Sequence, residues 1–120
     1  MPVVVALAAD LLFASRIQGT AGALGVRAEA FTRVEPLVAR ALEARPALVL
    51  IDLEARGLDV PSLIRRLRTE PALRHARIMG FVSHMNAGAA AAARNAGADR
   101  VLARSAFVEE LPRLLGMAQE

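Results

Sequence analysis

The 120-residue chain contains no cysteine, lysine, tryptophan or tyrosine. Without cysteine it forms neither disulfides nor thiolate metal sites, and it has no cysteine nucleophile. Its two histidines, with no cysteine to join them, argue against a zinc site. Charged residues interrupt every apolar stretch before it reaches the ~18 residues of a membrane span, and the N-terminus lacks the basic segment of a signal peptide. We therefore expect a cytoplasmic protein with no membrane partner.

Basic and acidic residues are nearly balanced. The fifteen basic residues are all arginines, the acidic residues number twelve, and the formal net charge is +3. Acidic residues are interspersed among the arginines, and only Arg65, Arg66 and Arg68 form a cluster. Four phenylalanines are the only aromatic residues, so the chain lacks both the basic stripe and the stacking platform of a nucleic-acid-binding surface. We expect no nucleic-acid partner.

Short apolar runs alternate with segments of helical periodicity along the chain. Runs rich in valine, leucine and isoleucine are typical of strands buried on both faces of a helix-covered parallel sheet. Right-handed crossovers between such strands produce a doubly wound sheet, so we predict a single α/β domain over residues 1–120. Strands are predicted at 3–8, 26–31, 47–52, 78–82 and 101–103. Helices are predicted at 11–24, 37–44, 87–96 and 107–117, with a further helix that begins at Pro61 and includes Leu67.

Turn and capping residues separate these elements. Pro36 has the position of a first-turn proline, where the missing N–H leaves no bond unmade. Asn86 is a candidate N-cap for the helix that follows it. Gly25 and Gly97 are stop signals for the preceding helices, because glycine readily adopts the left-handed conformation common just beyond a helix end.

Polar residues follow four of the five predicted strands at the point where each strand ends. They are Asp10, Asp52, Ser83 and Arg104. Because the carboxyl ends of parallel strands meet at one edge, which is where ligands bind in open α/β sheets, we expect these four side chains to lie close together.

Several local phrases resemble the receiver domains of two-component response regulators, the CheY-like family. The resemblance covers the whole chain and implies a flavodoxin-like three-layer sandwich with strand order 2-1-3-4-5. The phrase that ends at Asp52 is similar to the family's phosphoacceptor strand, and two others match its third helix and the entry to its fifth strand. These phrases are Pro46-Ala47-Leu48-Val49-Leu50-Ile51-Asp52-Leu53, Leu63-Ile64-Arg65-Arg66-Leu67-Arg68 with Glu70-Pro71, and Ala96-Gly97-Ala98-Asp99.

The resemblance implies a role for each of the four polar residues. Asp52 corresponds to the aspartate that accepts a phosphoryl group from a histidine kinase. Asp10 and Asp52 correspond to acidic ligands of Mg²⁺, which offsets the charge of the phosphoryl oxygens. Ser83 corresponds to the hydroxyl residue that senses the phosphoryl group, and Arg104 stands in the place of an invariant lysine.

Other positions depart from the family pattern. The paired acids after the first strand are reduced to Ala9-Asp10, so any Mg²⁺ is expected to bind weakly. Val101 replaces an aromatic switch residue, and Ser105 replaces a proline, so we expect a trans bond between Arg104 and Ser105. Glu54 is expected to crowd the site. Arg104 is expected to lock Asp52 in a permanent ion pair, because its guanidinium is larger and less mobile than an ammonium.

Ordinary structural roles compete with each of these assignments. Asp52 is interpreted either as a phosphoacceptor or as a strand-end carboxylate that caps a helix or pairs with Arg104. Asp10 is either a metal ligand or the N-cap of the first helix. Ser83 is either a switch residue or a loop hydroxyl.

Two functions follow from these interpretations. The first is a stand-alone, atypical receiver domain with weak or absent phosphorylation, which acts in phosphorelay signalling by binding a histidine kinase or a downstream protein. Residues 87–96, 101–103 and 107–117 then form its candidate contact face, where a second subunit could also dock. The alternative is a small flavodoxin-like or nucleotide-binding enzyme. Against it, Ala8-Ala9-Asp10-Leu11-Leu12 stands where a glycine-rich phosphate loop would follow the first strand.

Overall fold

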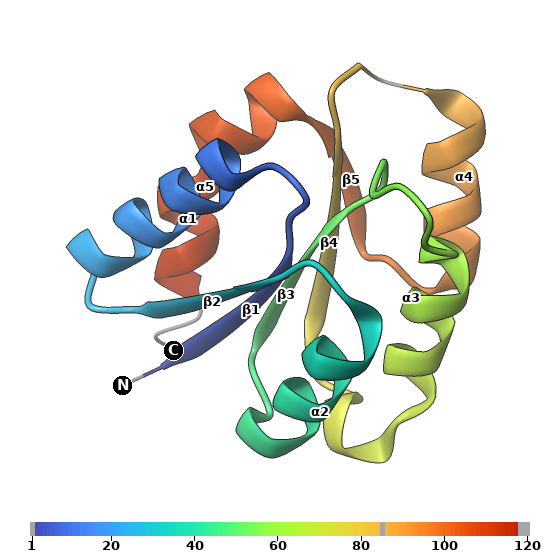
Figure 1. The fold of residues 1–120 in the computed structure, drawn as a ribbon, viewed down its shortest axis with the longest axis horizontal. Coiled ribbons are helices and arrows are strands. Elements are labelled where there is room, and N and C mark those ends of the chain that lie inside the picture. Colours follow the sequence, from blue (N-terminus) through green and yellow to red (C-terminus); the bar gives the residue numbers. More distant parts are fainter. Residues whose placement is uncertain (1, 85, 118–120) are drawn as a thin grey trace.

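The computed structural model describes residues 2–84 and 86–117, in which strands and helices alternate along the chain (Figure 1). The strands form one five-stranded sheet in the order β2-β1-β3-β4-β5, and every neighbouring pair is parallel. The predicted α/β architecture and strand order are confirmed. In chain order the elements are β1 Val3–Leu7, α1 Leu11–Ala23, β2 Arg27–Phe31, α2 Val34–Ala44, β3 Leu48–Asp52, α3 Val60–Thr69, the 3₁₀ turn η1 Pro71–Leu73, β4 Arg77–Val82, α4 Ala87–Ala96, β5 Arg100–Ala103 and α5 Arg104–Met117.

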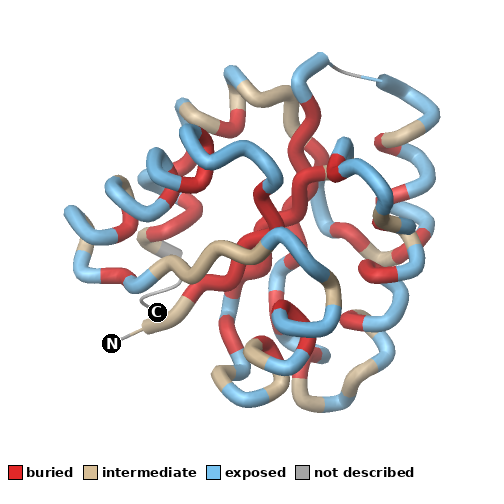
Figure 2. The backbone as a smooth tube through the Cα atoms, in the orientation of Figure 1, coloured by how far each residue is buried: buried red, intermediate tan, exposed pale blue. Residues whose placement is uncertain are grey.

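Helices cover both faces of the sheet. Figure 1 shows α1 and α5 on one side and α2, α3 and α4 on the other, while Figure 2 shows the central strands buried between them. Successive strand side chains point to opposite faces, so each strand supplies both cores. The core under α1 and α5 includes Val4, Leu50, Phe81 and Leu111. The core under the other three helices includes Val5, Ile51, Ile64 and Ile78.

Three of the four phenylalanines pack together under α1 and α5. The ring centroids of Phe13 and Phe81 are 4.8 Å apart, those of Phe81 and Phe107 are 4.7 Å apart, and those of Phe13 and Phe107 are 5.6 Å apart. Such tilted pairs stabilise beyond the apolar area they bury. The cluster joins the beginnings of α1 and α5 to β4 and so fixes the scaffold beneath the carboxyl edge of the sheet.

Local capping signals act as the sequence predicts. Asp10 Oδ1 accepts the backbone N–H groups of Leu12 at 2.9 Å and Phe13 at 3.3 Å, which confirms its role as an N-cap. Asn86 Oδ1 accepts the N–H of Ala89 at 3.1 Å and starts α4. Gly97 follows α4 with a φ of 124°, and a Cβ there would come within 3.0 Å of Arg68.

Two helices begin three residues earlier than the sequence predicts, and the other predicted boundaries differ by at most one residue. Helix α5 begins at Arg104 rather than at residue 107, directly after β5 ends at Ala103. Helix α2 begins at Val34, two residues before Pro36, so that this proline lies in the first turn as expected. Among the described residues, no helix is both long and apolar enough to cross a membrane.

Candidate functional site

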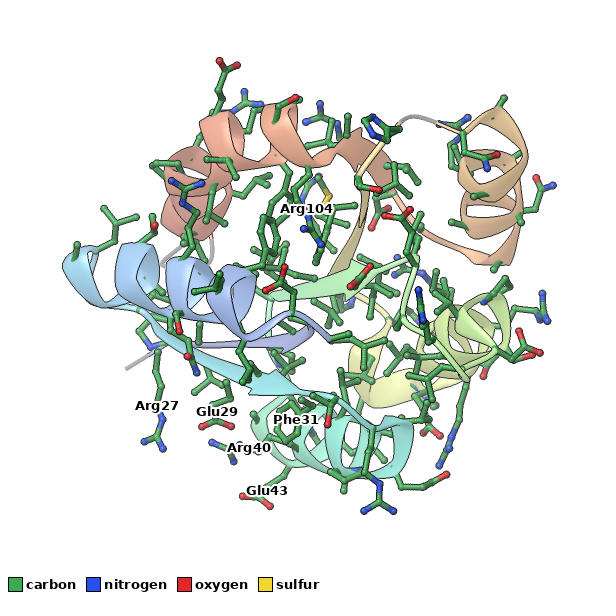
Figure 3. The ribbon with its side chains drawn as sticks, turned by 45° about the horizontal axis from the view of Figure 1, so that its top comes forward. Arg27, Glu29, Phe31, Arg40, Glu43 and Arg104 are labelled. Atoms are coloured by element: carbon green, nitrogen blue, oxygen red, sulfur yellow. The ribbon has the colours of Figure 1, made fainter. Side chains whose placement is uncertain are left out.

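The predicted polar residues lie where the strands end on one edge of the sheet. The parallel register pairs Leu7 with Ile51, Asp52 with Phe81, and Val82 with Ala103. The segments that leave β1, β3, β4 and β5 therefore emerge side by side. Figure 3 shows Arg104 at this edge, near the beginning of α5.

Asp52 ends β3 and is only 4% exposed, and it is the one buried polar or charged residue among those that the structure describes. Its Oδ1 accepts the backbone N–H of Glu54 at 2.9 Å. No described residue forms an ion pair with the Asp52 carboxylate. The chain thus buries a carboxylate with one hydrogen bond and no salt bridge among the described residues, which costs folding free energy.

Arg104 lies against the beginning of α1 and forms no ion pair with Asp52 among the described residues. Its Nη1 lies 3.5 Å from Asp10 Oδ2, and its Cζ lies 4.4 Å from the centroid of the Phe13 ring. The expected permanent ion pair between Arg104 and Asp52 is therefore wrong. The reason is that the planar guanidinium stacks on an aromatic face, which an ammonium would do less well. Arg104 Nε is buried and has no hydrogen-bond partner among the described atoms.

Asp10 is occupied on both carboxylate oxygens. Oδ1 caps α1, and Oδ2 faces Arg104. A divalent cation at this edge would need several free oxygens in one place. Among the described residues, no group of three acidic or histidine side chains is arranged to hold a metal ion. Asp10 and Asp52 by themselves therefore make an incomplete set of side-chain ligands for Mg²⁺.

Glu54 binds Ser83 with both of its carboxylate oxygens. Oε1 accepts the backbone N–H of Ser83 at 2.5 Å, and Oε2 accepts the Ser83 hydroxyl at 2.9 Å. These bonds, the backbone one first, hold the pKa of the Glu54 carboxyl below its usual value, while burial opposes the shift. The charges of Arg104 and His84 lower the same pKa further. The sequence gives no local signal for this pairing of Glu54 with Ser83.

The remaining departures from the family pattern lie around this edge. Val101 is 7% exposed and packs in the core beneath α2, α3 and α4. Its side chain has no ring that could alternate between an inward and an outward position. All described peptide bonds are trans, including the one between Arg104 and Ser105, as expected.

Comparison with known proteins finds similar structures but no similar sequences. No protein-family model matches the chain, and no curated protein sequence matches it. Solved structures match along nearly its whole length. The chemotaxis response regulator CheY4 of Vibrio cholerae has a TM-score of 0.84 at 16% identity, over 98% of each chain. A response regulator from Chloroflexus aurantiacus has a TM-score of 0.81 at 19% identity, over 97% of this chain and 99% of that one.

A third similar structure is a response regulator from Burkholderia pseudomallei, which holds a phosphorylated aspartic acid, a calcium ion and citrate. Its TM-score is 0.78 at 21% identity, over 96% of this chain and 66% of that chain. The chain therefore has the CheY-like receiver fold of response regulators. Identities this low demonstrate the fold but not the chemistry, because function depends on the residues at the site.

Proposed function

We propose that this protein is an atypical receiver domain that signals through protein contacts, with weak or absent phosphorylation of Asp52. The observation that carries the proposal is the pairing at the carboxyl edge. Asp52 stands where a phosphoacceptor would, yet Arg104 pairs with Asp10 and Ser83 pairs with Glu54. The neighbours that would assist phosphoryl transfer to Asp52 are therefore already paired with other residues.

Phosphoryl transfer to Asp52 would form an oxygen–phosphorus bond and break the bond between phosphorus and the donor. The transferred group carries negative charge on its outer oxygens, so catalysis depends on cations placed beside it. Here the Arg104 guanidinium lies over the Phe13 ring, and no three acidic or histidine side chains of the described residues assemble a metal site. Transfer without those cations is expected to be slow, and any Mg²⁺ is expected to bind weakly.

Contact with partner proteins is the remaining route to function for this fold. The face formed by α4, β5 and α5 is our candidate surface for a histidine kinase, a downstream signalling protein or a second copy of the chain. Ala87, Ala91 and Ala92 are exposed on α4 and give it little charge. We further propose that the protein acts in the cytoplasm and binds no nucleic acid, since its charges are balanced.

A nucleotide-binding or flavodoxin-like enzyme is the less favoured function. The segment after β1 is Ala8-Ala9-Asp10-Leu11-Leu12, which has no glycine to let a backbone approach a phosphate. Asp10 caps α1 with its own carboxylate, so the N–H groups of Leu12 and Phe13 are already bonded. A flavin or nucleotide that remains bound through purification would favour this alternative.

The first prediction concerns labelling of Asp52. We expect acetyl phosphate with Mg²⁺ to phosphorylate only a small fraction of the chains, as measured by intact-protein mass spectrometry. Beryllofluoride with Mg²⁺ should likewise produce only small amide shifts in NMR spectra. Asp52→Asn is the control, because it keeps the shape of the side chain and removes the acceptor.

Full labelling of the wild type, lost in Asp52→Asn, would contradict the atypical assignment and make the protein an ordinary receiver. Partial labelling that persists in Asp52→Asn would place the acceptor elsewhere. Binding to a candidate kinase, measured by calorimetry, is expected to be equal for the wild type and Asp52→Asn.

A further inference from the structure

Glu54 connects the ends of two neighbouring strands. Its backbone N–H donates to Asp52 Oδ1 at 2.9 Å, and its carboxylate accepts two hydrogen bonds from Ser83. One residue thus bridges the end of β3 and the beginning of the connection between β4 and α4. The partners Glu54 and Ser83 are 29 residues apart in the sequence, so the tertiary fold creates this contact.

The two donors of Ser83 are the kind that an oxyanion uses. A backbone N–H and a hydroxyl that converge on one group bind carboxylate, sulfate or phosphate oxygens through charge-assisted hydrogen bonds. At 2.5 and 2.9 Å, the Glu54 carboxylate has taken both of them. An incoming oxyanion would have to displace Glu54 before it could bind Ser83.

The charge at this edge also opposes a second anion. Asp10, Asp52 and Glu54 contribute three carboxylates. Facing them are the Arg104 guanidinium, which acts on Asp10 and Glu54, and His84, which acts on Glu54. A phosphoryl group brings further negative charge. With Glu54 in place, that charge would lie beside like charges and would lack the Ser83 donors.

We propose that Glu54 is a built-in anion that occupies the oxyanion-binding donors of Ser83 and holds Ser83 in place at the end of β4. The inference rests on the proposed function, since it explains why phosphorylation is weak. The Glu54 side chain is exposed to solvent, and Gly57 follows in a left-handed conformation with a φ of 73°. Replacement of this carboxylate therefore frees Ser83 without disturbing the buried core.

The test compares Glu54→Ala and Glu54→Gln with the wild type. Glu109→Ala is the matched control, because Glu109 is an exposed acid with no hydrogen bond or ion pair among the described residues. The first readout is the Ser83 amide in ¹H–¹⁵N NMR spectra. We expect Glu54→Ala to shift this resonance upfield and to speed its hydrogen exchange by about tenfold or more, with no change in Glu109→Ala. Circular dichroism establishes that each variant folds.

The second readout is binding of inorganic sulfate, followed at the same amide. We expect Glu54→Ala to bind sulfate about tenfold more tightly than the wild type, a difference of about 1.4 kcal/mol. Glu54→Gln, which keeps an acceptor but loses the charge, is expected to fall between them. If the chemical shift and exchange rate of the Ser83 amide are the same in Glu54→Ala and the wild type, Glu54 does not bond Ser83. If the two proteins bind sulfate equally, Glu54 does not block the Ser83 donors.

Neither readout requires chemistry at Asp52. Full phosphorylation of the wild type would contradict the proposed function. An unchanged Ser83 amide or unchanged sulfate binding in Glu54→Ala would contradict this inference. The two failures are therefore distinguishable.

Discussion

Arg104 illustrates how one side chain redistributes the charges of a site. A lysine ammonium is a compact, mobile charge, while the guanidinium is a plane that stacks on rings. In this protein the plane lies 4.4 Å from the Phe13 centroid, and Asp10 lies beside it. Asp52, at the end of the neighbouring strand, is left without that cation. The guanidinium therefore pairs with Asp10, and no described residue forms an ion pair with Asp52.

Glu29 offers a separate test at the scale of single residues. Figure 3 shows Arg27 and Arg40 around it. Arg40 donates to its two oxygens at 2.5 and 3.1 Å, and Arg27 Nε lies 3.0 Å away. The hydrogen bonds from Arg40 are the largest cause that lowers the pKa of Glu29, burial opposes them, and the charges of Arg40 and Arg27 add to the lowering.

The sign of the resulting pH dependence follows from proton linkage. A carboxyl whose pKa is lower in the folded state stabilises the fold above its unfolded pKa, about 4.3 for glutamate, and loses that effect as the pH falls through the folded pKa. We expect Glu29→Gln to be less stable than the wild type at pH 7. We also expect it to lose less stability as the pH falls from about 5 to about 3. Urea unfolding at several pH values measures both. Parallel stability curves for the two proteins would show that Glu29 contributes nothing to acid unfolding.

At the scale of elements, α5 contains a proline that its position does not favour. Pro112 lies inside Arg104–Met117, where a proline cannot donate a hydrogen bond to the preceding turn and its ring crowds that turn. The helix nevertheless continues, because Phe107, Leu111, Leu114 and Leu115 on one side of it are buried in the core under α1 and α5. Tertiary burial thus outweighs local propensity.

Replacement of Pro112 tests this account. We expect Pro112→Ala to stabilise the protein by about 1–3 kcal/mol, less than the full propensity difference, because proline also restricts the unfolded chain. Pro36→Ala is the control, since Pro36 lies in the first turn of α2, where no helical partner for its N–H exists. Thermal unfolding followed by circular dichroism measures both variants. Equal changes in the two would refute the argument from position.

Some helix ends are specified by residues nearby in the sequence, and others are specified by tertiary packing. Asp10 and Asn86 cap their helices through bonds to N–H groups two or three residues away, so the sequence alone located them. The beginning of α5 at Arg104 had no such local signal. The sequence pattern predicts this beginning three residues too late, at residue 107, because only the docking of α5 on the sheet extends the helix to the end of β5.

At the scale of the whole molecule, one sheet separates two apolar cores. Leu50 and Ile51 are adjacent in β3, yet Leu50 packs under α1 and α5 while Ile51 packs under α2, α3 and α4. Both are fully buried. Because the same strands supply residues to both cores, loss of one helical layer would also expose the sheet on which the other layer packs.

We therefore expect one cooperative unfolding transition that both cores control. Leu50→Ala and Ile51→Ala should each destabilise the protein by about 2–5 kcal/mol, the usual range for cavities left in a core. Leu12→Ala is the control, since Leu12 is 83% exposed and should change stability little. Urea unfolding followed by fluorescence of a reporter tryptophan on each face would measure the transition. Separate midpoints for the two faces would contradict the shared sheet.

The sequence by itself determined the alternation of strands and helices, the caps and the edge at which the polar residues gather. Periodicity and capping depend on residues close together in the chain, and parallel strands must end on one edge. The tertiary structure alone decided the pairing at that edge. Arg104 meets Asp10 across 94 residues of chain, and Glu54 meets Ser83 across 29. Such contacts depend on ångström-scale placement of loops from different strands, which no local pattern of residues encodes.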